Sequence, residues 1–210
     1  MQYTGSIDNR GILEIIRRSC SYVDARLMNH GYRVAYIVSE MLKPYFHEDA
    51  RKIRDVCFLA LLHDIGAYKT DEISKMLQFD TDDVLAHSVY GYLFIKYFSP
   101  LKKLSGAILL HHATWQVLEH SEVFPEGIRL LAQVIHVADR IDVAMEVQHL
   151  TWEETAVLLK KESGTKFSPF IADLALACDF HTPFEGDTDA ESLFFHLFSE
   201  ISLTHYETTD

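Results

Sequence analysis

The sequence predicts an all-α fold, built as a single-domain helical bundle. Apolar residues recur at helical spacing along most of the 210 residues, and no convincing alternation of period two indicates a strand. The chain has only nine glycines and five prolines, and no low-complexity linker divides it. Apolar residues make up 48% of the sequence, so a substantial core can form and wholesale disorder is excluded.

The helices expected in the first half follow from capping signals and apolar stripes. The first begins at Asp8-Asn9-Arg10, and the second has Val34 and Val38 on one apolar stripe. Gly66 suits the C-terminal cap of the third. Acidic clusters beginning at Thr70 and at Asp80 open the fourth and the fifth. The expected ranges are 11–27, 29–45, 48–63, 71–77 and 82–97.

In the second half, Ser99-Pro100 starts a further helix, and a looser loop over 119–127 precedes a strongly apolar one. The expected ranges are 101–113, 128–147, 152–161, 168–178 and 191–204. We expect the main domain to cover residues 26–180. An N-terminal helix would precede it over 1–25, and a C-terminal helical extension would follow over 181–210.

Composition excludes several classes of function. The net charge of −12 argues against binding to a nucleic-acid polymer, which depends on basic residues. Three cysteines without paired spacing indicate a reducing compartment, with no disulfide framework and no thiolate zinc site. There is no apolar signal segment at the start of the sequence, and no apolar run approaches the length of a membrane span. We therefore expect a soluble cytoplasmic protein that does not act on membranes.

Histidines and aspartates lie on apolar helix faces at regular intervals. Taken singly, each has an ordinary structural explanation, such as a hydrogen-bonded core histidine or a helix end. Together they are unusual, because a buried polar group without a partner costs several kcal/mol. Successive members are 33, 23, 24 and 27 residues apart, so each can come from a different helix. Such a set predicts a site for two metal ions, formed by His30, His63, Asp64, His87, His111, His112 and Asp139.

The order of these residues resembles the HD-domain phosphohydrolase superfamily, and specifically its HD-GYP branch. The matching motifs are HDIG at 63–66, HSVYG at 87–91, HH at 111–112 and VADRIDVAM at 137–145. The segment GTKFSP at 164–169 is similar to the Gly-x-x-Phe-x-Pro pattern that closes HD-GYP domains. The similarity covers residues 26–178, most of the chain.

The resemblance implies an HD-type helical bundle with two or three divalent transition-metal ions, usually iron or manganese, with zinc or nickel as further options. It implies hydrolysis of a phosphodiester in a small phosphorylated or nucleotide substrate, with cyclic di-GMP as the leading candidate, by a metal-bridging hydroxide. His63 and Asp64 would be catalytic, and Asp64 would bridge the ions. By motif match the metal ligands would be His30, His63, Asp64, His87, His111, His112 and Asp139.

The sequence departs from the HD-GYP pattern mainly where the substrate would bind. Ala67 replaces the lysine that follows HDIG, Ala113 replaces a glutamate, and the Gly-Tyr-Pro tripeptide is missing. EVQHLTW at 146–152 stands in place of a basic, aromatic segment. Arg26 stands where members with three metals have a glutamate, which favours two ions. Lys69 or Arg140 could bind the substrate phosphate instead, although an ordinary surface charge is the more common explanation for each.

Three functions are compatible with this pattern. The first is a phosphodiesterase of the HD-GYP kind, and the second is an HD hydrolase of another phosphate ester. The third is a catalytically weak HD-like module for signalling or protein interaction. Retention of all seven ligand positions favours the enzymes, whereas loss of the substrate residues favours the module. A homodimer is also compatible with the sequence.

Overall fold

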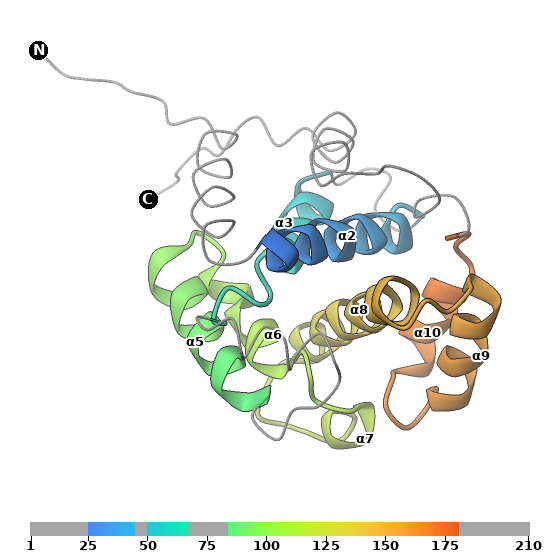
Figure 1. Cartoon of the computed structure of the whole chain (residues 1–210). Coiled ribbons are helices and arrows are strands. Elements are labelled where there is room, and N and C mark those ends of the chain that lie inside the picture. Colours follow the sequence, from blue (N-terminus) through green and yellow to red (C-terminus); the bar gives the residue numbers. More distant parts are fainter. Residues whose placement is uncertain (1–24, 45–49, 68–83, 181–210) are drawn as a thin grey trace, which may run out of the picture.

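The computed structural model describes residues 25–44, 50–67 and 84–180 (Figure 1). These residues contain helices and no strand, which confirms the all-α prediction. The α-helices are α2 Ala25–Leu42, α3 Ala50–Leu61, α5 Val84–Phe98, α6 Ser105–Leu110, α7 Trp115–Leu118, α8 Glu126–Asp142, α9 Trp152–Glu162 and α10 Pro169–Leu176. A 3₁₀ turn, η1 Lys102–Leu104, precedes α6, and a π-helical turn, η2 Val143–Val147, continues α8.

Helix α8 is the centre of the bundle, with α2, α6 and α10 packed against it (Figure 1). Eight consecutive residues of α8, 132–139, are buried, which is what neighbours on several sides require. α3 lies along α2, and α5 lies along α6. Fully buried side chains such as Ile37 on α2 and Ile135 on α8 each stabilise this core by about 1.5–3 kcal/mol.

Several predicted boundaries are wrong. α2 runs unbroken through Ala25–Leu42, so the expected break near residue 28 does not exist. α3 ends at Leu61 and α6 at Leu110, each two or three residues earlier than predicted. The histidine motifs therefore lie in the turns after these helices, where backbone carbonyls without a helical partner are available to their side chains. The short helix α7 was also missed.

Gly66 is not the C-terminal cap of α3, which ends five residues earlier at Leu61. It also lacks the positive φ of a left-handed cap, which among the described glycines only Gly164 has. The role of Gly66 is close approach to α5. A Cβ on Gly66 would lie 2.0 Å from the backbone oxygen of His87 and 2.5 Å from the backbone nitrogen of Gly91. The missing side chain therefore lets the turn after α3 touch the backbone that carries His87.

Two of the expected segments and two of the expected helices lie outside the described residues. They are the N-terminal helix over 1–25, of which only Ala25 is described, the extension over 181–210, and the helices at 71–77 and 191–204. Within the described ranges, no helix combines the length and the apolar character that crossing a membrane requires.

Candidate metal centre

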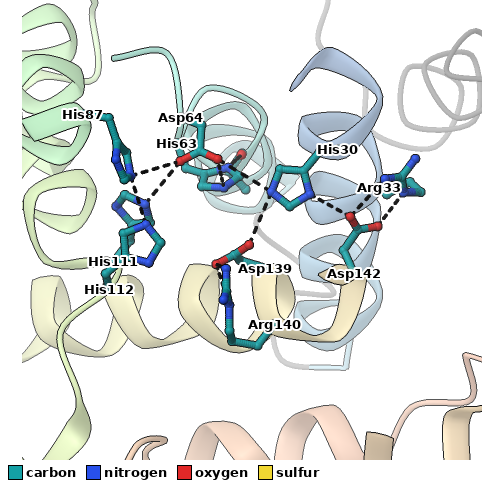
Figure 2. Close-up of polar contacts among 11 residues, drawn as sticks. His30, Arg33, His63, Asp64, His87, His111, His112, Asp139, Arg140 and Asp142 are labelled. Atoms are coloured by element: carbon teal, nitrogen blue, oxygen red, sulfur yellow. Dashed lines mark hydrogen bonds and ion pairs between the residues drawn. The ribbon is translucent and has the colours of Figure 1, made fainter. Parts of the chain in front are cut away.

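Asp64 lies at the centre of the predicted constellation, and each of its oxygens faces two imidazoles (Figure 2). Its Oδ1 is 3.5 Å from Nε2 of His87 and 3.4 Å from Nε2 of His111. Its Oδ2 is 3.1 Å from Nε2 of His63 and 3.7 Å from Nε2 of His30. The side chain thus belongs to two groups that could each hold a metal ion, and it is 5% exposed.

The helix ends orient two of these imidazoles. The Nδ1 atom of His63 is 2.7 Å from the carbonyl oxygen of Ala60, and Nδ1 of His111 is 2.6 Å from that of Ile108. A carbonyl only accepts, so Nδ1 carries the proton in both rings. In the neutral form of each ring, Nε2 is then the nitrogen with the lone pair, and in both rings this atom lies next to Asp64. These are the orientations that a metal ligand needs.

His87 and His112 complete one side of the centre. Their Nε2 atoms are 2.9 Å apart. Burial lowers the pKa of His87 to about 4, and burial together with nearby His111 holds the pKa of His112 well below its usual range. Both rings are therefore neutral at pH 7 and able to offer a nitrogen lone pair to a cation.

His30 forms the other side and is held by a carboxylate that the sequence analysis did not single out. Its Nδ1 donates to Oδ2 of Asp142 at 2.6 Å, and its Nε2 lies 3.3 Å from Oδ1 of Asp139. Asp142 is fully buried and also accepts from Nε and Nη2 of Arg33. An imidazole whose second nitrogen is bound by a carboxylate is the usual arrangement around metal-ligating histidines.

Asp139 faces His30 on one side and Arg140 on the other (Figure 2). Nε and Nη2 of Arg140 donate to Oδ2 of Asp139 at 3.0 and 2.7 Å. Burial by itself raises the pKa of Asp139, but Arg140 and His30 outweigh it and hold the pKa well below its usual range. The pKa of Asp64 is also low, because its histidine neighbours outweigh burial. Both carboxylates are ionised at pH 7.

Several polar atoms of this cluster have no hydrogen-bond partner among its other residues, and a metal ion would be a suitable partner for them. His63 Nε2, His111 Nε2 and Asp64 Oδ1 are buried and make no hydrogen bond. Leaving such atoms unsatisfied costs about 1–3 kcal/mol each, and a cation at the centre would remove that cost. Imidazole nitrogens and carboxylate oxygens are the donors that iron, manganese, zinc and nickel accept.

The family model described as HD domain matches residues 27–144, more than half of the chain. The chain belongs to the HD domain family. HD domains bind divalent metals and are generally hydrolases, and the buried His/Asp cluster of this HD domain could hold such ions. A comparison with curated proteins gives no match.

In this HD domain all seven predicted ligand residues converge on one buried region. Lys69 lies outside the described residues. The side chain of Arg140 is 13% exposed and donates hydrogen bonds to Asp139. Arg26 is part of α2. Ala67 is buried and contributes no charge.

Asp142 and Arg33 were missed, but a signal for them exists in the sequence. Asp142 follows Asp139 by three residues, and Arg33 follows His30 by three. Residues three apart share a helix face, so α2 and α8 present two matching pairs to each other. Gln133 was missed too. It donates to the carbonyl of Ala113, just after the histidine pair, and accepts from the backbone N–H of Ser168.

We predict that Asp142→Asn will lower metal affinity or activity by about 10–100-fold, because an outer partner of a ligating histidine typically contributes that much. The variant keeps the shape of the side chain but loses the charge that orients His30. Metal content after equilibrium dialysis and the rate of ester hydrolysis both measure the effect. Glu146→Gln, which removes a more distant carboxylate 3.9 Å from Arg33, is the control. Equal metal affinity in the two variants would contradict the prediction.

We also predict that metal uptake will displace a proton from His30. Burial alone lowers the pKa of His30, but Asp139 and Asp142 outweigh it and raise the pKa to about 10. The metal-free ring is therefore protonated at pH 7 and must lose a proton from Nε2 to bind a metal. The apparent metal affinity should rise with pH between 6 and 9, because the proton competes for the same lone pair.

Isothermal titration calorimetry in buffers of different ionisation enthalpy counts the protons released on metal binding. The wild-type protein should release about one proton more than His30→Asn. Equal release by the two proteins would show that His30 is not protonated before metal binds.

Proposed function

We propose that this HD domain is a metal-dependent phosphohydrolase that holds two divalent transition-metal ions, iron or manganese being the most suitable. The observation that carries the proposal is the position of Asp64, with one oxygen facing each of two histidine groups. A carboxylate in that position can bridge two ions. Its neighbours His30, His63, His87, His111, His112 and Asp139 would complete the ligand set.

The side chains of this chain would hold and orient the reacting groups. His63 and His111 are fixed by backbone carbonyls, so their Nε2 atoms need no reorganisation to bind. Two divalent ions bound together supply a nucleophile at neutral pH and stabilise the charge that develops on phosphoryl oxygens. The burial of Asp64 and Asp139 keeps the electrostatics of the site strong, because little water screens them.

Within this function, we propose a phosphodiesterase that acts on a nucleotide, and cyclic di-GMP stays the first substrate to test. Two observations favour another phosphate ester. Ala67 and Ala113 stand where the HD-GYP pattern has a lysine and a glutamate, so those contacts to substrate cannot form. A reducing cytoplasmic location and a homodimer stay predictions.

The experiment is to purify the chain, measure bound metal per chain, and assay it with manganese(II) or iron(II). The substrates are bis-(p-nitrophenyl) phosphate, p-nitrophenyl phosphate and a panel of nucleotides that includes cyclic di-GMP. Turnover that disappears in His63→Ala but persists in His120→Ala supports the proposal. His120 is a suitable control because its side chain is 86% exposed and contacts Glu119.

The outcomes separate the three functions. Turnover on other esters but not on cyclic di-GMP would select an HD hydrolase outside the HD-GYP branch. Bound metal without turnover on any ester would favour the signalling or interaction module. Absence of bound metal would rule out both enzymes.

A further inference from the structure

We propose that Arg140 and Lys166 form an anion subsite beside the metal centre, which takes a phosphate group attached to an apolar or planar organic group. The inference rests on the proposed function and names residues that would replace the missing substrate contacts. Lys166 was not among the predicted site residues. It lies in the GTKFSP segment, far along the chain from the histidine motifs.

A cavity of about 350 Å³ lies next to the centre, between η2, α9 and the turn that follows α9. Its size falls within the range of about 300–1,000 Å³ that small-molecule sites occupy. Most of its wall is apolar, with two cations placed on it, as in sites that bind one polar group of an organic ligand. Its lining includes Arg140, Ala144, Leu158, Leu159, Lys166 and Phe167.

Arg140 connects this cavity to the metal centre. Arg140 lines the cavity, and its guanidinium donates two hydrogen bonds to Asp139. A ligand in the cavity would therefore lie one side chain away from a proposed metal ligand. This arrangement suits a substrate with one phosphate at the ions and a second anionic group in the cavity.

The backbone fixes Lys166 in place. Its N–H donates to the carbonyl of Glu162 at 3.0 Å, and its own carbonyl accepts from the N–H of Trp115 at 2.9 Å. The turn before it uses Gly164 at a φ of 81°, which few other residues adopt. The ammonium lies over the ring of Phe167, 5.8 Å from its centroid. The backbone of Lys166 is therefore fixed beside the cavity that this residue lines.

The two cations are close enough to affect each other. Burial, and then Arg140, lower the pKa of Lys166. Two like charges at one half-buried place repel each other, and a bound anion would relieve this repulsion. Arginine and lysine are the side chains that bind phosphate, the first through a planar fork and the second as a point charge. Glu162 also lines the cavity and offsets one of the charges.

The other reading is that Arg140 and Lys166 only balance the charges of Asp139 and Glu162. Calorimetric titration of the full chain, loaded with manganese, distinguishes the readings. The probe is phenylphosphonate, whose P–C bond cannot be hydrolysed by a phosphatase. The subsite predicts binding that is about tenfold weaker in Lys166→Gln, because the variant loses a charge-assisted hydrogen bond to the anion. Lys166→Arg should restore it.

Lys160→Gln is the matched control, since Lys160 is exposed on α9 and does not line the cavity. Methylphosphonate should bind more weakly than phenylphosphonate, because it cannot fill the apolar part. Metal content and melting temperature should be equal in all four proteins. Phenylphosphonate affinity in Lys166→Gln within twofold of wild type would overturn the subsite.

These outcomes are distinct from those of the proposed function. Lys166-dependent binding in a protein that hydrolyses no ester would keep the subsite and reject the hydrolase. Hydrolysis together with Lys166-independent binding would keep the hydrolase and reject the subsite.

Discussion

Asp64→Asn is expected to abolish hydrolysis and to reduce the bound metal. Asparagine keeps the size of the side chain but removes the charge, and it replaces one carboxylate oxygen by an amide that cannot bridge two cations. Both oxygens of Asp64 face histidine nitrogens, so both halves of the centre lose their shared ligand. We expect a fall in rate of about a thousandfold or more, because metals supply several kcal/mol and each ~1.4 kcal/mol is a factor of ten.

The matched control is Asp55→Asn, which changes an aspartate on α3, the helix that precedes the turn with Asp64. The carboxylate of Asp55 lies near Arg54. It should keep its metal and its rate. Metal content by elemental analysis and initial rates on bis-(p-nitrophenyl) phosphate measure both variants. Full metal content and full activity in Asp64→Asn would refute the assignment of Asp64 as a bridging ligand.

Gly66→Ala is expected to destabilise the fold and to disturb the metal centre at the same time. The added Cβ would lie 2.0 Å from the backbone oxygen of His87, far inside contact distance, so α5 or the turn must move. Overpacking typically costs about 1–3 kcal/mol and sometimes more, and a backbone atom cannot rotate away. The displaced helix carries His87, which is why metal affinity should fall as well as the melting temperature.

Gly127→Ala is the control for this substitution. A Cβ on Gly127, near the start of α8, meets nothing within 4 Å. Alanine favours the helix over glycine by about 0.5–1 kcal/mol, so this variant should be as stable as wild type or slightly more stable. Thermal melting and metal titration of both variants test the contrast. Equal melting temperatures would show that the close contact of Gly66 carries no energetic weight.

Most of the candidate site could be predicted from the sequence, because its residues lie in short motifs of fixed order. His63 and Asp64 follow an unbroken apolar run that ends inside the bundle, and that run is visible without a structure. Asp142 and Arg33 were not predicted, since their spacing of three residues from Asp139 and His30 shows a shared helix face but not that the two faces meet. Only the packing of α2 against α8 shows that they hold His30.

The helices, too, were predicted from the sequence only in part, because their ends differ from the prediction. Apolar spacing predicted the helices around α3 and α6, but it carried both of them past their ends. The earlier ends are accompanied by one long-range contact and by two local hydrogen bonds. The turn after α3 must press Gly66 against α5, and His63 and His111 bind carbonyls that the end of each helix leaves available.

The sequence by itself determined the all-α class, the family and the seven residues proposed to bind metal. These depend on residue type and spacing, which are properties of the linear chain. The tertiary structure alone decided that Asp64 lies between two histidine groups, that Asp142 orients His30, and that Lys166 lies beside Arg140. Except for the adjacent His63 and Asp64, these partners are more than twenty residues apart in the chain, and the packing of the helices brings them together.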